Sequence, residues 1–210
     1  MIFSYLAPSV ASILCAIYLL VQINGLSGSS DENMSGKFLY FAYGSNLLAQ
    51  RIHINNPSAQ RAGIGKLKDY QLDFITYSKR WRGASATIVN KTGSHVWGAL
   101  WQIDNTHMES LDRQEGVENN LYFPLNVELD TPEGKTVIAR VYQQTKTPET
   151  LENIENLPDD RKPSAVYLGT ILKGAEESKL PEEYKEWLHR IPHNGYDGEV
   201  DIGLSLNITK

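Results

Sequence analysis

The fold of this chain is decided by the stretch Phe38-Leu39-Tyr40-Phe41-Ala42-Tyr43-Gly44-Ser45-Asn46, an apolar and aromatic run that stops abruptly on three turn-forming residues. The aromatic side chains favour a buried β-strand. Gly44 can adopt a positive φ, and Ser45 or Asn46 can cap a helix over residues 47–54. The pattern therefore predicts a strand, a tight turn and a helix N-terminus in direct succession.

A turn of this kind directs backbone N–H groups into one small space, because the first N–H groups of a helix have no intrahelical partner. Together with the positive end of the helix dipole, these donors can bind a carboxylate or an oxyanion that develops during a reaction. Short motifs that contain glycine also occur in structural corners without function. The stretch by itself is compatible with both interpretations, and the structural corner is the more frequent one.

The rest of the chain predicts alternating strands and helices. Strands are expected over residues 67–74, 84–89, 96–103, 121–129 and 136–143. The turn chemistry of residues 90–94 and 130–134 joins the last four of these strands into two hairpins. Helices are expected around Met108 and Leu111 with Gly116 closing the helix, over 165–178 with Ser164 as the cap, and over 181–190. This order indicates the α+β class, with a small, mostly antiparallel β-barrel or sheet and helices on one side.

The N-terminal part differs in composition from the rest. No charged side chain occurs from Ile2 to Ile23, and about 22 apolar residues are long enough to cross a bilayer, which needs roughly 20. We predict a signal-anchor, with a cleaved signal peptide and a buried helix as alternatives. Asp31 and Glu32 follow the segment, which favours an exoplasmic domain. The protein is expected to be anchored in a membrane or to enter the secretory pathway. We expect the apolar segment and its linker over residues 1–30, the folded domain over residues 36–198, and a tail over residues 199–210.

Composition excludes several classes of function. The 210 residues carry a formal net charge of −5 without a basic stripe, which argues against nucleic acid as a partner. Cys15, the single cysteine, lies in the apolar segment, so the folded part can hold neither a disulfide nor a cysteine metal site. Patterns for a zinc protease, a phosphate loop or a dinucleotide site are missing from the sequence, and no cofactor or metal is expected.

Glu115 is the strongest candidate for acid–base chemistry. It lies in the last turn of the predicted short helix, where the negative end of the helix dipole disfavours the charged carboxylate and raises its pKa. A general base that works near neutral pH requires such a pKa. Asp112 and Glu118 are the competing acids nearby. Candidate pocket tyrosines, whose rings pack while their hydroxyl groups need partners, are Tyr122, Tyr142 and Tyr167.

Several segments taken together resemble the γ-glutamylcyclotransferase family. The resemblance runs in collinear order from about Phe38 to Tyr196, which makes it more specific than any one motif. The segments that carry it are Tyr40-Phe41-Ala42-Tyr43-Gly44-Ser45-Asn46-Leu47, Arg51-Ile52-His53, Asn56-Pro57-Ser58-Ala59, Leu72-Asp73-Phe74, Val96-Trp97-Gly98 and Ser110-Leu111-Asp112-Arg113-Gln114-Glu115-Gly116-Val117.

The resemblance implies a small mixed β-barrel with flanking helices, and conversion of a γ-glutamyl amino acid to 5-oxo-L-proline with release of the amino acid. It implies that Glu115 is the catalytic acid and base. The substrate-binding residues that it implies are Tyr40, Phe41, Ala42, Tyr43, Gly44, Ser45, Asn46, Tyr122, Tyr142 and Tyr167. Two departures are a shorter loop at residues 78–83, which bears on the leaving amino acid, and the apolar N-terminal segment, since family members are typically cytosolic.

Three alternatives stay open at this stage. A γ-glutamylamine cyclotransferase would use the same loop and acid on ε-(γ-glutamyl)lysine. A serine hydrolase would use Ser45 as its nucleophile with one of the scattered histidines as base. A binding module without catalysis would keep the pocket alone. The oligomeric state is not determined by the sequence, with a homodimer as one alternative to a monomer.

Overall fold

The structure is a computed structural model, and it describes residues 36–202. The predicted signal-anchor at residues 2–23 and most of the predicted tail lie outside the described residues. No helix within residues 36–202 is both long enough and apolar enough to cross a membrane. Near the end of this range Ile202 is buried against the core.

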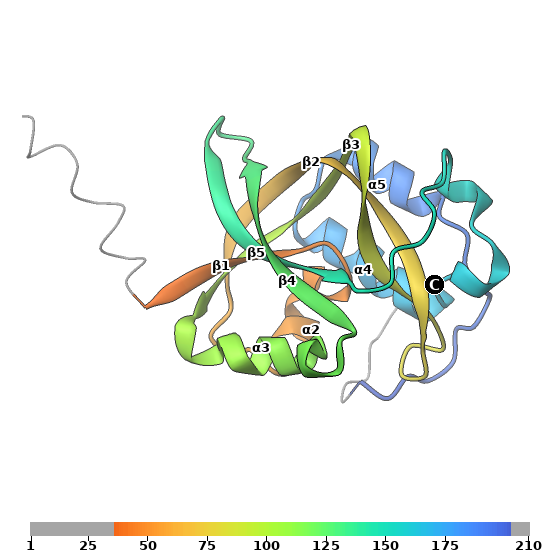
Figure 1. Ribbon diagram of the computed structural model, residues 1–210, viewed down its shortest axis with the longest axis horizontal. Helices are drawn as coiled ribbons and strands as arrows, with labels where there is room; N and C mark the ends of the chain where they lie inside the picture. The colour runs from red at the N-terminus through yellow and green to blue at the C-terminus, as the bar shows by residue number, and fades with distance from the viewer. Residues whose placement is uncertain (1–35, 203–210) are drawn as a thin grey trace, which may run out of the picture. The chain divides into compact units, whose positions relative to one another are not determined.

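The described part of the chain forms a closed β-barrel in the order β1-β3-β2-β4-β5 (Figure 1). Its strands are β1 (Lys37–Ala42), β2 (Gln60–Ser78), β3 (Gly83–Asp104), β4 (Tyr122–Asp130) and β5 (Thr136–Gln144). β1 pairs with β5 in parallel, and the other neighbouring strands are antiparallel. The small, mixed, mostly antiparallel barrel that the sequence predicts is therefore confirmed.

The core of the domain draws on every strand and on the two C-terminal helices. Its fully or almost fully buried members include Phe41, Phe74, Ile88, Trp101, Leu129, Val141, Ile171 and Leu188. The hairpin of β4 and β5 is confirmed, with Leu125 paired to Val141 and Asp130 paired to Thr136 across the predicted turn. The barrel closes through the pairs Tyr40 with Arg140 and Lys66 with Asp130, and it gives the loops at one end a rigid support.

The other predicted hairpin is wrong. Residues 83–104 form one continuous strand of 22 residues, β3, which pairs along its length with the 19-residue β2. Residues 91–94 lie in an irregularity of this pairing, between the pairs Tyr70 with Asn90 and Lys68 with His95. The backbone N–H of Gly93, whose φ is +80°, donates to the Asp69 carboxylate at 2.8 Å. The turn-forming residues therefore bend a strand at a bulge and do not reverse it.

Helices and 3₁₀ turns connect and cover the barrel. They are η2 (Ser45–Leu47), α2 (Ala49–Ile52), η3 (Asn105–His107), α3 (Met108–Gln114), η4 (Val117–Asn119), η5 (Ile154–Asn156), η6 (Asp159–Arg161), α4 (Ala165–Glu177) and α5 (Glu182–His189). Two predicted caps are confirmed: the Ser164 hydroxyl accepts from the Tyr167 N–H, and Gly116 has a left-handed φ of +68° directly after α3.

The turn after β1 has a different geometry from the predicted one. Gly44 has a φ of −106°, so glycine is not needed there for a positive φ. A Cβ at Gly44 would lie 3.3 Å from the Tyr167 hydroxyl, so a larger residue there would crowd the side chain that α4 contributes. Neither Ser45 nor Asn46 caps a helix with its side chain, because the predicted helix is replaced by the short η2 and α2.

Helix α4 holds this turn in place by direct contact between backbones. A Cβ at Gly174 of α4 would lie 2.5 Å from the Leu47 Cβ and 2.6 Å from the Leu48 nitrogen. The Ser178 hydroxyl, just beyond α4, donates to the Leu47 carbonyl at 3.3 Å. The sequence stretch that opens the domain therefore depends on a helix that follows it by more than a hundred residues.

We expect Gly174→Ala to destabilise the domain by about 1–3 kcal/mol, because the added methyl group displaces the backbone of the turn. Gly169→Ala is the control, since Gly169 is a partly exposed residue of the same helix, where alanine favours the helix by up to about 1 kcal/mol. Urea unfolding of both variants measures the difference. Equal stabilities would contradict the packing of α4 on the turn.

Candidate active site

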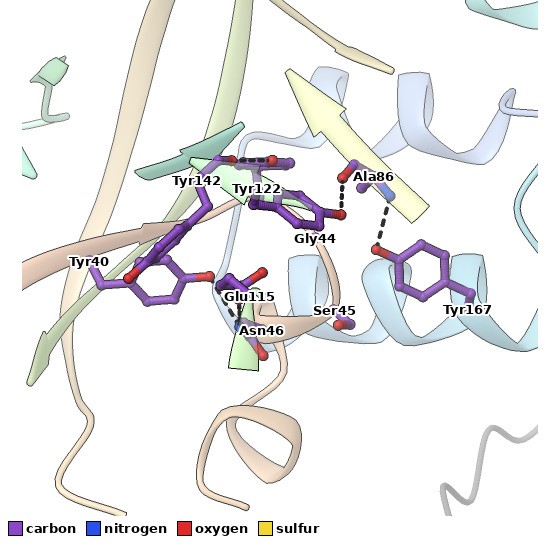
Figure 2. Close-up of a pocket in the computed structure, with 10 residues that line it drawn as sticks. Tyr40, Gly44, Ser45, Asn46, Ala86, Glu115, Tyr122, Tyr142 and Tyr167 are labelled. Carbon is purple, nitrogen blue, oxygen red and sulfur yellow. Dashed lines mark hydrogen bonds between the residues drawn. The ribbon is translucent and has the colours of Figure 1, made fainter. Parts of the chain in front are cut away.

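A cavity of about 50 Å³ lies where the β1 turn, the end of α3, strands β3 to β5 and helix α4 meet (Figure 2). Its lining residues are Tyr40, Tyr43, Gly44, Ser45, Asn46, Ala86, Glu115, Tyr122, Tyr142 and Tyr167. Eight of the ten predicted substrate-binding residues thus surround one space together with the predicted catalytic residue. The turn and the distant carboxylate that the sequence singles out therefore line the same cavity in the folded chain.

Phe41 and Ala42, the other two predicted substrate-binding residues, do not line this cavity. Successive side chains of a strand point to opposite faces, and Tyr40 occupies the face toward the cavity. Phe41 is completely buried in the core and lies against Gly98, where a Cβ would meet its ring at 2.6 Å. Alternation along β1 accounts for Phe41, whereas Ala42 lies on the same face as Tyr40 and is completely buried.

The Glu115 carboxylate is held by two side-chain amides. Asn46 Nδ2 donates to Glu115 Oε1 at 3.2 Å, and Gln114 Nε2 approaches the same oxygen at 3.4 Å. Gln114 Nε2 also donates to Asn46 Oδ1 at 3.3 Å, and Asn56 Nδ2 donates to Gln114 Oε1 at 3.2 Å. This chain of amides orients one carboxylate oxygen and leaves the other for a ligand in the cavity.

Burial raises the pKa of Glu115 from its ordinary 4.5 to about 7. The positive charge of Arg51 and the hydrogen bonds from Gln114 and Asn46 oppose this effect, and the Asp112 charge adds to it. Glu115 is the C-cap of α3, at the helix end where the sequence predicts it, and loss of solvent is the main cause of the raised pKa. A carboxyl group with this pKa can accept and return a proton near neutral pH.

Asp112 and Glu118, the competing acids, are placed differently. Arg140 Nη2 donates to the two Asp112 carboxylate oxygens at 2.6 and 2.9 Å, and the Tyr142 hydroxyl donates to Asp112 Oδ1 at 2.5 Å. Asp112 is therefore engaged in a fixed network that positions Tyr142. Glu118 is exposed and does not line the cavity.

The backbone of Ala86 on β3 positions two of the tyrosines that line the cavity. The Tyr122 hydroxyl donates to the Ala86 carbonyl at 2.8 Å, and the Ala86 N–H donates to the Tyr167 hydroxyl at 3.2 Å (Figure 2). Gln144 Nε2 also donates to the Tyr122 hydroxyl at 3.2 Å. One residue of β3 thus fixes the ring positions of residues from β4 and α4.

The hydroxyl of Tyr40 can donate a hydrogen bond to a ligand. It accepts from Asn46 Nδ2 at 3.1 Å, which leaves its own hydrogen for a ligand. Burial and the nearby Glu115 carboxylate hold the pKa of Tyr40 well above its ordinary value, and burial does the same for Tyr43 and Tyr122. Burial also raises the pKa of Tyr167 to about 12. These tyrosines stay neutral at physiological pH, so Glu115 is the lining residue suited to proton transfer.

Some residues of the site were missed by the sequence-based reasoning. Ala86 acts through its backbone, which leaves no signal in the residue type. Gln114, Arg140 and Arg51 are polar residues without a motif of their own, although Gln114 and Arg51 lie inside the segments that carry the family resemblance. Their roles depend on contacts between distant elements, and spacing along the chain does not contain those contacts.

Ser45 lacks the partner that a serine nucleophile needs. No histidine is among the residues that line the cavity in the described part of the chain. His53 instead contacts the Ala59 carbonyl at 2.8 Å, and His107 contacts the Ser58 hydroxyl at 2.6 Å. The histidines with assigned contacts therefore serve other parts of the fold.

Comparison with known proteins gives consistent matches. A sequence model of the AIG2-like family matches residues 95–188. A γ-glutamylcyclotransferase of Bos taurus is 43% identical over 177 residues, covering 82% of this chain and 88% of the bovine protein. A γ-glutamylcyclotransferase of Homo sapiens is 42% identical over 189 residues, covering 88% and 93%. A solved structure named γ-glutamyl cyclotransferase matches with a TM-score of 0.71 and 39% identity, covering 82% of this chain and 95% of that one.

The raised pKa of Glu115 predicts a stability difference that depends on pH. The folded protein binds this proton more tightly than the unfolded chain, so stability falls as pH rises from about 4.5, the ordinary value, to about 7. Glu115→Gln removes this loss because glutamine cannot ionise. We expect the variant to be more stable than the parent by about 1–3 kcal/mol at pH 8 and equal to it at pH 4.5.

Chemical unfolding at several pH values measures this difference. Glu118→Gln is the matched control, because Glu118 is exposed, and we expect no such dependence there. A Glu115→Gln advantage that does not grow between pH 4.5 and pH 8 would show that the carboxylate is not destabilised by burial.

Proposed function

The chain belongs to the γ-glutamylcyclotransferase family of enzymes, and from that premise we propose that it converts γ-glutamyl amino acids to 5-oxo-L-proline with Glu115 as general acid and base. The observation that carries this proposal is a carboxyl group with a pKa of about 7 in a cavity lined by the Tyr-Gly-Ser-Asn turn. The reaction needs one group that moves a proton near neutral pH and a space that folds the glutamyl chain. The cavity offers both.

The first step is removal of a proton from the substrate. The α-amino group must attack the γ-carbonyl carbon, but near neutral pH it is an ammonium group without a free electron pair. Glu115 in its ionised form accepts one ammonium proton. The neutral nitrogen then forms the new C–N bond, and the carbonyl oxygen becomes an oxyanion.

The second step breaks the original amide bond. Glu115 returns its proton to the leaving nitrogen as the old C–N bond breaks, and the carbonyl of the five-membered ring forms again. The second proton that the attacking nitrogen loses also goes to the released amine, which leaves as an ammonium group. Atoms and charges balance without a cofactor, and one carboxyl group serves as base and then as acid.

The turn after β1 and the tyrosines hold the substrate in a reactive shape. Cyclisation requires the α-nitrogen within about 3–3.5 Å of the γ-carbon. Backbone N–H groups of Gly44, Ser45 and Asn46 are suited to the oxyanion or to the α-carboxylate of the glutamyl group. Because η2 has only three residues, these groups act as individual donors and not through a helix dipole. The Tyr40 hydroxyl, which also lines the cavity, adds a neutral hydrogen-bond donor beside Asn46.

A hydrolase that uses Ser45 is less well supported, because no histidine lines the cavity with it. The product distinguishes the two reactions, since hydrolysis releases glutamate and cyclisation releases 5-oxoproline. Formation of glutamate in place of 5-oxoproline from γ-glutamyl-alanine would contradict the proposal.

We expect Glu115→Gln to lower kcat for γ-glutamyl-alanine by about 10²–10⁴-fold, the usual contribution of a general acid and base. The measurement is 5-oxoproline formation by the purified full-length chain, with circular dichroism to verify folding. Glu118→Gln, which removes an exposed carboxylate near the same helix, should keep the parent activity. An active Glu115→Gln variant would refute the assigned role.

The pH dependence of the reaction should report the same group. Because Glu115 must be ionised to accept a proton, kcat/KM should rise with pH and level off above about 7, the pKa of Glu115. Asn46→Leu removes a hydrogen bond that lowers this pKa, so its rising limb should move to higher pH. Values of kcat/KM between pH 5 and pH 8.5 measure the rising limb of the parent and that of the variant. A parent limb with its midpoint near pH 4.5 would contradict the assignment.

A further inference from the structure

A second and larger cavity adjoins the first. It measures about 260 Å³ and shares Ser45, Asn46, Glu115, Tyr122 and Tyr167 with the first cavity. It extends past Ser78 of β2 and Ser85 of β3 toward Arg51 of α2 and toward Arg80 and Trp81 in the turn between these strands. The Glu115 carboxylate therefore lies at the boundary of two spaces.

Arg51 is a buried cation with unused hydrogen-bonding capacity. Its exposed fraction is 5%, and its Nε and Nη1 atoms are buried without a hydrogen-bond partner in the described part of the chain. A buried guanidinium group whose donors are unsatisfied is costly, and such groups are normally bonded to an anion. The same side chain lines the second cavity, so an anion in that cavity would lie beside its positive charge.

A second positive charge lines the same cavity. It belongs to Arg80, which is exposed. Loss of solvent lowers the pKa of Arg51, the Glu115 carboxylate raises it, and the Arg80 charge lowers it further. Two like charges that face one cavity repel each other, and an anion between them removes that repulsion. Glu115 is the single acidic residue among those that line the second cavity.

We propose that the second cavity holds the released amino acid of the substrate and that Arg51, assisted by Arg80, binds its α-carboxylate. This inference rests on the proposed function, since it places the scissile amide beside Glu115, at the boundary. The glutamyl part then occupies the smaller cavity and the leaving residue the larger one. In a γ-glutamyl α-amino acid the carboxylate is one carbon from the scissile nitrogen, which keeps it close to the boundary.

The proposal makes Arg51 a specificity-determining residue. In ε-(γ-glutamyl)lysine the scissile nitrogen carries a chain of four methylene groups before the carbon that bears the carboxylate. Simple γ-glutamylamines have no carboxylate at all. Both kinds of substrate therefore lose the contact with Arg51, and the enzyme selects α-amino acids as leaving groups.

The test compares γ-glutamyl-alanine with γ-glutamyl-ethylamide, whose leaving group is alanine without its carboxylate. Hydrogen bonds to charged groups contribute roughly 1.5–3 kcal/mol, so the parent kcat/KM should favour γ-glutamyl-alanine by about 10–10²-fold. Arg51→Gln should bring this ratio close to one, and Arg51→Lys should keep part of it because it keeps the charge. Arg80→Gln should lower the ratio by a smaller factor, since Arg80 is exposed.

Because Arg51 lowers the pKa of Glu115, all variants are assayed at pH 8.5, and any effect of Arg51 on Glu115 itself acts on both substrates and cancels in the ratio. The control is Arg82→Gln, which removes the same charge from the same turn at a residue that stacks on Tyr196 and does not line the cavity. If Arg51→Gln does not fold, Arg51→Lys and Arg80→Gln carry the test.

The outcomes separate the two proposals. If the parent forms no 5-oxoproline from either substrate, the proposed function fails and this inference fails with it. If the parent uses both substrates but its ratio is near one, or if Arg51→Gln lowers both rates by the same factor, the proposed function stands and the inference alone is overturned.

Discussion

The hydrogen bonds of Asn46 join the two parts of the chain on which the site depends. The side-chain amide nitrogen of Asn46 donates both to the Tyr40 hydroxyl and to the Glu115 carboxylate. The backbone carbonyl of Asn46 accepts from Trp101 Nε1 at 3.0 Å. The turn after β1, the end of α3 and the wall of the barrel are thereby tied to one residue. Because these partners are buried or half-buried, solvent does not replace the bonds, and the carboxylate stays where its pKa is raised.

The barrel supplies the rigidity that this arrangement requires. Closure places β1 between β3 and β5, so that Tyr40 and Tyr142 come from neighbouring strands, with ring centroids 5.9 Å apart. Ala86 on β3 then fixes Tyr122 and Tyr167 through its backbone. Neutral donors on rigid elements surround a single proton-transferring group. Such an arrangement stabilises developing charge without reorganisation during the reaction, and the neighbouring cavity with Arg51 and Arg80 provides room for the part of a substrate that leaves.

The limits of reasoning from sequence are visible in particular elements. The barrel, the β4–β5 hairpin, α3, α4 and their caps were predicted correctly, because apolar alternation and capping residues are local signals. The turn-like residues 90–94 were misread as a hairpin, since turn chemistry does not distinguish a chain reversal from a bulge between two long strands. The sequence allows a positive φ at Gly44, but its φ is −106° and a Cβ there would lie 3.3 Å from the Tyr167 hydroxyl. Asn46 was expected to cap a helix, but its amide is committed to Tyr40 and Glu115.

By itself, the sequence determined the strand that delivers Gly44-Ser45-Asn46, the short helix that ends at Glu115, and the family to which both belong. Their patterns are contained within a few neighbouring residues. Only the tertiary structure decided that these segments line one cavity and that burial is the main cause of the raised pKa of Glu115. It also decided that Arg51 lines an adjoining space, with Nε and Nη1 buried and unpaired within residues 36–202. The physical reason is that desolvation and hydrogen-bond geometry depend on which distant elements pack together, and closure of the barrel makes that choice.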